Sequence, residues 1–153
     1  MKKILVLLTV ISLAPLTALA QAAHIYPDVS SAKADIAKAL VQAKREHKRV
    51  ILDFGGDWCP DCQVLDIYYH KPENQKLLDK NYVLVFVNIG HMDANTDIAA
   101  KYGVPIAKGV PALAVLKANG TVLYSQKRGE FNKMRHMDES SITDFLKEWE
   151  PVK

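Results

Sequence analysis

The sequence lacks the features that would divide or specialise a chain of its length. It contains no internal repeat, no low-complexity tract and no obvious linker between blocks of different composition. Its 153 residues are enough for one domain of ordinary size and too few for two comfortable ones. Hydrophobic residues make up 49% of the chain and charged residues 24%, which is a globular rather than a disordered composition. We therefore expect a single folded domain.

Long hydrophobic runs are also scarce, apart from one at the N-terminus. Lys2 and Lys3 precede an apolar run whose first part, Ile4–Leu13, is ten residues long. A helix of that length is too short to cross a hydrocarbon core about 30 Å thick. The run closes with Ala18 and Ala20, small residues at the two positions that a signal peptidase reads. Residues 1–20 are therefore expected to be a cleaved signal peptide, with an uncleaved membrane anchor as the alternative.

The remainder, residues 21–153, is expected to be one exported domain, located in the periplasm or secreted. Disulfides persist in such compartments. No cysteine follows the apolar run, which speaks against a lipoprotein. Loss of Lys2 and Lys3 with the leader leaves 18 of the 20 basic residues against 17 acidic ones. That balance gives no support for a nucleic-acid partner, and we expect none.

Helix and strand patterns alternate along the mature sequence. Apolar residues recur at helical spacing over residues 32–49, and the serines before them, Ser30 and Ser31, predict a serine cap. Further helices are predicted at residues 60–70, 72–81, 97–103 and 139–149, the last capped by Asp138. Strands are predicted at residues 50–55, 82–89, 112–117 and 121–126, with a turn at 118–120. This order indicates an α/β fold with a central mixed β-sheet flanked by helices on both faces.

Cysteine is rare, and Cys59 and Cys62 are the two that the chain contains. Structural zinc needs four ligands, and no two histidines are spaced to supply the other two, so we expect no metal. A structural disulfide at this spacing would close a tiny loop and constrain the unfolded chain less than a long one would. The third possibility is a redox dithiol, which we favour because the pair lies where a buried strand ends and a helix begins.

The position of the two cysteines assigns them different roles. A cysteine at a helix N-terminus faces unpaired N–H groups and the positive end of the helix dipole, both of which favour the thiolate. The thiolate is the attacking species in disulfide exchange. Cys59 precedes Pro60, which occupies the first helical position, whereas Cys62 lies one turn further on. We therefore expect Cys59 to attack a substrate disulfide and Cys62 to resolve the mixed disulfide.

Two segments of the chain resemble those of the thioredoxin superfamily. Residues 51–62, ILDFGGDWCPDC, resemble its active-site segment, an apolar strand with Asp-Phe followed by Trp-Cys-x-x-Cys. Residues 109–120, GVPALAVLKANG, resemble its cis-proline loop with the strand and hairpin turn that follow. The resemblance spans roughly residues 31–149. It implies a thioredoxin fold and a thiol-disulfide oxidoreductase.

The resemblance also implies roles for residues around the cysteines. Asp53 matches the buried acid that exchanges a proton with the second cysteine, and Trp58 matches the tryptophan beside the dithiol. Pro111 matches the cis-proline, which would turn the backbone of Val110 toward an incoming peptide. The chain departs from the family at Phe86, where many members carry a lysine near the buried acid.

The residues between and beside the cysteines bear on the direction of electron flow. Pro60 and Asp61 separate the two cysteines, and Asp57 lies just before them. Acidic charge beside Cys59 opposes the helix dipole, destabilises the thiolate and makes the pair more reducing. We therefore predict a reductase, although Val110 before the cis-proline resembles the oxidase branch.

The expected activity is reduction of protein disulfides by dithiol exchange, with the Cys59–Cys62 disulfide as the redox group and no bound cofactor. Its partners would be protein disulfide substrates and a thiol electron donor, membrane-embedded or otherwise, and we expect a monomer. A disulfide oxidase or isomerase on the same site is one alternative. A non-catalytic thioredoxin-fold binding module is the other.

Overall fold

The computed structural model describes residues 24–152, and within them a four-stranded mixed sheet forms the centre of the molecule. The strands are β1 (Arg49–Gly55), β2 (Tyr82–Asn88), β3 (Ala112–Leu116) and β4 (Val122–Ser125), in the order β2-β1-β3-β4. β1 pairs with β2 in parallel and with β3 antiparallel, and β3 pairs antiparallel with β4. The predicted mixed sheet is confirmed.

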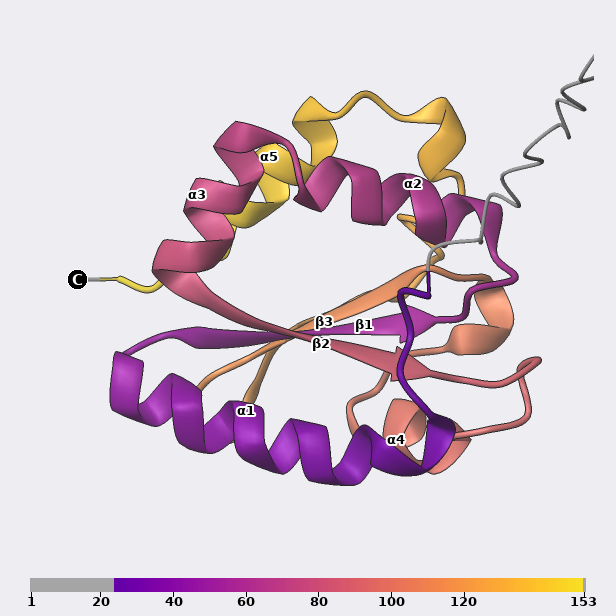
Figure 1. Cartoon of the computed structure of the whole chain (residues 1–153), viewed down its shortest axis with the longest axis horizontal. Helices are drawn as coiled ribbons and strands as arrows, with labels where there is room; N and C mark the ends of the chain where they lie inside the picture. Colours follow the sequence, from indigo (N-terminus) through magenta and orange to yellow (C-terminus); the bar gives the residue numbers. More distant parts are fainter. Residues whose placement is uncertain (1–23, 153) are drawn as a thin grey trace, which may run out of the picture.

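Helices cover both faces of this sheet, as predicted. The helices are α1 (Ala32–Glu46), α2 (Pro60–Tyr69), α3 (Pro72–Asn81), α4 (Thr96–Lys101) and α5 (Ser140–Glu148). Short 3-10 turns, η1 (Val29–Ser31), η2 (Ile106–Lys108) and η3 (Met134–His136), lie in the connections. Figure 1 shows α1 and α4 on one face and α2, α3 and α5 on the other.

The central strand β1 supplies the core on both faces. Its residues alternate between the two sides, as the pleat of a strand requires. Leu52 and Phe54 belong to the cluster packed under α1 and α4, and Ile51 belongs to the cluster under α2 and α5. All three side chains are fully buried. This places the end of β1, and the cysteines that follow it, between two packed layers.

Proline begins two consecutive helices, and the predicted restart at Pro72 is confirmed. Pro60 is the first residue of α2 and Pro72 the first of α3, positions where the missing N–H of proline costs nothing. Ser31 is the residue before α1, as predicted, but its side chain makes no capping hydrogen bond, and the predicted cap of the last helix by Asp138 is wrong. The Ser31 hydroxyl donates to Asp35 rather than capping α1, and Glu139, not Asp138, is the residue before α5.

The predicted signal peptide, residues 1–20, lies outside the described residues. Among residues 24–152, no helix has both the length and the apolar character needed to cross a membrane.

Candidate active site

The two cysteines form a disulfide at the junction of β1 and α2. Cys59 is the residue that caps α2, and Cys62 lies in its first turn, with their Cα atoms 5.2 Å apart. The amide of Cys62 donates to Sγ of Cys59 at 3.1 Å. Cys59 is 4% exposed and Cys62 is 1% exposed. Once the bond is reduced, the Cys59 sulfur therefore keeps a helix N-terminal amide that stabilises its thiolate.

A second wall of the site is the loop that precedes β3. The Val110–Pro111 peptide bond is cis, as predicted from the sequence. The carbonyl oxygen of Val110 lies 3.6 Å from Sγ of Cys59. Segments about fifty residues apart in the sequence thus meet at the sulfur, and the Val110 backbone borders the site where a substrate must approach.

Trp58 forms the exposed rim of the site. Its side chain is 42% exposed, its Nε1 donates to the carbonyl of Gly90, and its ring stacks on that of His91 with centroids 5.8 Å apart. The indole is therefore held beside the cysteines by the loop after β2. It offers a partly exposed aromatic surface next to the disulfide.

Asp53 is buried completely behind the cysteines. It lies on β1 opposite Phe86 of β2, the position at which the sequence lacked the expected lysine. Burial raises the pKa of Asp53 to about 7, even though a hydrogen bond from the Tyr26 hydroxyl to its Oδ1, at 3.0 Å, acts in the opposite direction. Its Oδ2 has no hydrogen-bond partner within the described part of the chain. A carboxyl that titrates near neutrality can take or give a proton under ordinary conditions.

Asp61 is not an uncompensated charge, which corrects the electrostatic argument made from the sequence. It is 8% exposed and accepts hydrogen bonds from the backbone N–H of Arg135 at 2.9 Å, and from Nε and Nη2 of the same residue at 3.3 and 3.2 Å. Burial alone would raise the pKa of Asp61, but these bonds outweigh it and hold that pKa below its ordinary value. The Arg135 guanidinium therefore compensates most of the Asp61 charge, and Asp61 destabilises the Cys59 thiolate less than predicted.

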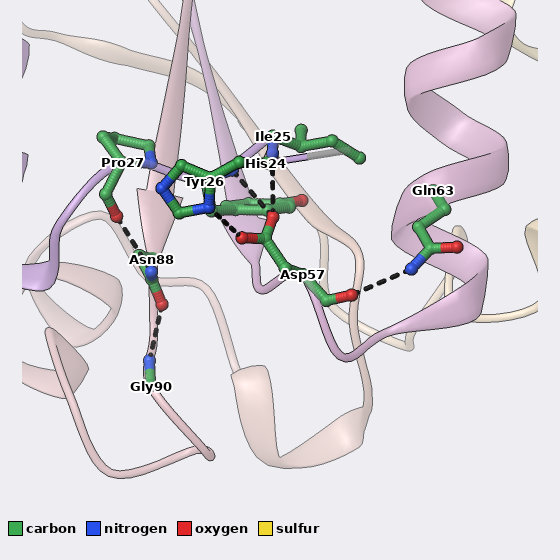
Figure 2. A network of polar contacts seen from close by, with 8 residues as sticks. All are labelled: His24, Ile25, Tyr26, Pro27, Asp57, Gln63, Asn88 and Gly90. Carbon is green, nitrogen blue, oxygen red and sulfur yellow. Dashed lines mark hydrogen bonds and ion pairs between the residues drawn. The ribbon is translucent and has the colours of Figure 1, made fainter. Parts of the chain in front are cut away.

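Asp57 is also engaged, and it holds the segment that leads into the first helix. Its Oδ1 accepts the backbone N–H groups of Ile25 and Tyr26 at 2.9 and 3.0 Å, and its Oδ2 lies 2.6 Å from Nδ1 of His24. Figure 2 shows these contacts, together with the bond from the Gln63 side chain to the Asp57 carbonyl. These bonds outweigh burial and lower the pKa of Asp57. Its predicted role as a charge acting on Cys59 is therefore replaced by a structural one.

Two functional neighbours were missed from the sequence. Tyr26 lies 27 residues before the acid that it contacts, and Arg135 lies 74 residues after its partner. Tyr26 comes from the segment before η1 and Arg135 from the short 3-10 turn η3, and neither segment has a periodic pattern, so the sequence held no signal for either contact. Within residues 24–152, no three His, Cys, Asp or Glu side chains lie close enough together to hold a metal ion.

The chain is similar to known proteins over most of its length. A family described as thioredoxin-like matches residues 31–118. The crystal structure of a disulphide isomerase from Xylella fastidiosa Temecula1 superposes with a TM-score of 0.78 and 35% identity, covering 82% of this chain and 96% of that one. A thioredoxin from Thermus thermophilus, at 19% identity and a TM-score of 0.54, shares the fold and covers 73% of this chain and 81% of its own.

Two curated relatives are much longer proteins. A protein disulfide-isomerase from Arthroderma benhamiae is 31% identical over 116 residues, which are 76% of this chain and 20% of the relative. The thiol:disulfide interchange protein DsbD from Klebsiella pneumoniae is 28% identical over 134 residues, 87% of this chain and 21% of the relative. The chain thus spans about a fifth of the length of each. The matched family covers more than half of the chain and includes the strand, the cysteine pair and the cis-proline loop. The Cys59–Cys62 disulfide provides the chemical group for thiol-disulfide exchange, and the chain belongs to the thioredoxin-like family.

Proposed function

We propose that this protein reduces disulfides in exported proteins, with Cys59 as the nucleophile and Cys62 as the resolving thiol. The observation that carries the proposal is the disulfide at the start of α2, whose Cys59 sulfur accepts the Cys62 amide and borders the cis-proline loop. Cys59 caps the helix and Cys62 lies more deeply buried inside its first turn. Cys59, at the helix cap and beside the cis-proline loop, is therefore the sulfur that we assign to the attack on a substrate disulfide.

The reaction divides into two exchange steps. The Cys59 thiolate attacks one sulfur of the substrate disulfide, a new S–S bond forms, and the other substrate sulfur leaves as a thiolate. Cys62 then loses its proton and attacks Sγ of Cys59, which releases the second substrate sulfur as a thiolate. Asp53 is the proposed acceptor of the Cys62 proton, supported by its burial behind the pair and its pKa of about 7. The products are a reduced substrate and the Cys59–Cys62 disulfide.

The reductive direction rests on the surroundings of Cys59. Cys59 is 4% exposed, and its sulfur faces a carbonyl oxygen, that of Val110, at 3.6 Å. Burial and a neighbouring partial negative charge both disfavour a thiolate, and they oppose the amide of Cys62. A less stable thiolate makes the dithiol form a better electron donor. The acids at positions 57 and 61 contribute less to this balance than the sequence predicted, because each is already paired.

An exported reductase needs a supply of electrons. The leader pattern of residues 1–20 supports export, and a compartment in which disulfides persist would keep the pair oxidised unless a donor reduced it. We propose a thiol donor, membrane-embedded or otherwise, that attacks the same Cys59–Cys62 disulfide. The similarity to a thiol:disulfide interchange protein supports such a partner.

Disulfide isomerisation is the second candidate. It is favoured by the names of two relatives, of which the Xylella protein is matched over 96% of its length. In an isomerase, a second thiolate of the same substrate attacks the mixed disulfide, forms a new substrate disulfide and displaces the Cys59 thiolate before Cys62 reacts. The same two cysteines and the same cis-proline loop would serve that reaction, so it needs a functional test.

The deciding measurement is the equilibrium of the Cys59–Cys62 pair against glutathione, read by mass after thiol trapping. A reduction potential near or below about −230 mV is expected for a reductase, and a value near about −120 mV would instead indicate an oxidase. Refolding of a scrambled disulfide protein, compared with reduction of a native one, then separates isomerase from reductase. The Cys59→Ser, Cys62→Ser double variant is the control that must lose both activities; a binding module would retain its function.

A further inference from the structure

The segment before the first helix places a tyrosine beside the buried acid. Tyr26 is fully buried, although it lies only a few residues after the expected end of the leader. Its hydroxyl donates to Oδ1 of Asp53 at 3.0 Å, and its ring packs edge-on against Phe86 with centroids 5.4 Å apart. Tyr26 therefore supplies the polar contact to Asp53 that its strand neighbour Phe86 cannot supply.

We propose that Tyr26 is a positioning residue for the resolving step, holding the Asp53 carboxyl beside Cys62 through its hydroxyl. The inference rests on the proposed role of Asp53 in that step. Tyr26 does not itself exchange electrons with the substrate; it acts through the acid. The sequence pattern did not predict this role for Tyr26.

The geometry around Gly55 brings Tyr26 and Cys62 to the same place. A Cβ on Gly55 would lie 2.7 Å from Cζ of Tyr26 and 2.8 Å from Sγ of Cys62. The phenol and the sulfur therefore face the same small space, which only a glycine leaves open. Because the hydroxyl on that phenol also bonds Asp53, one side chain lies next to both the proton donor and its proposed acceptor.

Hydrogen bonds from the active-site loop and from the end of β2 fix the backbone on either side of Tyr26. Asp57, two residues before Cys59, accepts the backbone N–H groups of Ile25 and Tyr26. The Asn88 side chain, at the end of β2, donates to the carbonyl of Pro27 at 2.8 Å. Figure 2 shows both anchors on either side of Tyr26. Residues 24–28 are thus bound both to the loop that carries the cysteines and to the end of β2, and we call them the N-terminal clasp.

Proton transfer at the resolving step follows from this arrangement. Cys62 gives its proton to the Asp53 carboxylate as its sulfur bonds to Cys59 and the substrate thiolate leaves. The Tyr26 hydrogen bond favours the carboxylate, which is the form able to accept that proton. The other titratable groups whose charges couple to Asp53 come from α2 and are Asp66 and Tyr69. Its partners in the sheet, Phe86 of β2 and Leu113 of β3, do not titrate.

The test is the pH dependence of the two exchange steps in the Tyr26→Phe variant. Reduced protein is mixed with excess aromatic disulfide that releases a coloured thiolate. The first release reports attack by Cys59, and the second reports resolution by Cys62. Loss of the hydroxyl disfavours the carboxylate, so the pH midpoint of the second release should move upward by about one unit, while the first release keeps its profile.

Tyr69→Phe is the matched control. Tyr69 is also buried, but its hydroxyl has no hydrogen-bond partner in the described structure, so both profiles should stay unchanged. Asp57→Asn weakens the clasp without changing the phenol, so it should also move the pH midpoint of the second release upward. The same substitution should have a smaller effect in the Tyr26→Phe background. An unchanged second release in a folded Tyr26→Phe variant would overturn the inference.

The proposed function fails in a distinguishable way. If Asp53→Asn leaves the second release of the otherwise unaltered protein unchanged, the acid has no role in resolution and the inference falls with it. If the unaltered protein releases no thiolate at all, the exchange activity itself is wrong. The positioning role is supported if Tyr26→Phe shifts the pH midpoint of the second release, whereas Asp53→Asn slows the second release equally at every pH.

Discussion

At the scale of single residues, the two cysteines differ more in access than in chemistry. Cys59 caps α2 beside the Val110 carbonyl, whereas Cys62 sits inside the helix against Tyr26 and Gly55. In the proposed reduction, a substrate sulfur bonded to Cys59 is released when Cys62 attacks Sγ of Cys59. The division of labour therefore depends on which sulfur is reachable.

This difference predicts opposite outcomes for the two single substitutions. Cys62→Ser should accumulate a mixed disulfide with substrate, because the first exchange proceeds and the second cannot. Cys59→Ser should trap nothing and show no exchange. Mass spectrometry of each variant after incubation with an oxidised protein substrate gives the readout. An adduct on Cys62 in the Cys59→Ser variant would contradict the assignment of the nucleophile.

Arg135 offers a second prediction, through the charge that it compensates. Its side chain is half exposed, while the Asp61 carboxylate that it contacts is nearly buried. In Arg135→Gln the carboxylate loses its counter-charge one residue from Pro60 and two from Cys59. We expect the pKa of the Cys59 thiol to rise by roughly half to one unit, since a neighbouring unit charge is worth on the order of 1 kcal/mol at such a site.

The pH dependence of Cys59 alkylation in the reduced protein measures that shift. Asp61→Asn combined with Arg135→Gln removes both charges and should return the thiol pKa close to its original value. Equal rises in the single and the double variant would mean that Arg135 acts by packing rather than by charge.

At the scale of elements, the helix carrying the cysteines is braced by α3 and α5. Asn74 of α3 is buried, donates to the carbonyl of Tyr68 at the end of α2 and accepts the Thr143 hydroxyl of α5 at 2.6 Å. Lys147 of α5 and Glu73 of α3 form a second contact between the same two helices at 2.8 Å, exposed to solvent. One pair is buried and polar, the other is an open ion pair.

The two contacts should contribute very differently to stability. Thr143→Val keeps the shape but leaves the Asn74 oxygen buried without its donor, which should cost about 1–3 kcal/mol of unfolding free energy. Lys147→Ala removes a surface ion pair between the same helices and should cost less than about 1 kcal/mol. Urea denaturation of the oxidised protein compares them. A larger loss from Lys147→Ala would show that the brace is electrostatic.

Elements were predictable from the sequence because their signals are local. The period of apolar residues, the prolines at the starts of α2 and α3, and the glycine turn before β4 all act within a few positions. The caps were harder to predict. A 3-10 turn precedes α1 and is capped by Asp28, while Ser31, the residue before α1, donates its hydroxyl to Asp35 instead of accepting a backbone N–H. Local rules cannot show which of several neighbouring polar residues will cap a helix.

The site was only partly predictable. Asp53 and Pro111 lie within motifs of fixed order, so the resemblance to a family located them. Tyr26 and Arg135 meet the site across 27 and 74 residues through loops. No spacing rule links such positions, and the compensation of Asp61 was therefore missed. Tertiary contacts between segments far apart in the sequence are what single-sequence reasoning leaves out.

At the scale of the whole molecule, the buried acid imposes a cost on folding that depends on pH. The pKa of Asp53 is 3.8 in its ordinary state and about 7 in the fold, because burial disfavours the charged form. Below the lower value the carboxyl is protonated in both states and costs nothing. As the pH rises between them, the unfolded chain releases a proton that the folded chain retains, so stability falls. Above the higher value the loss is complete.

Asp53→Asn should remove this pH dependence. An amide cannot ionise, and it still offers an oxygen to the Tyr26 hydroxyl. The difference in pKa corresponds to on the order of 4 kcal/mol. The oxidised variant should therefore match the unaltered protein near the low end of the window and be more stable above pH 7, by up to that amount. Urea unfolding at several pH values through the window measures the difference in stability. The pH-dependent contributions of acids with lowered pKa values, such as Asp61, cancel in this difference because both proteins carry them. A constant difference across the window would mean that the fold does not raise the pKa of Asp53, and its carboxylate would then be too weak a base for the role proposed with Cys62.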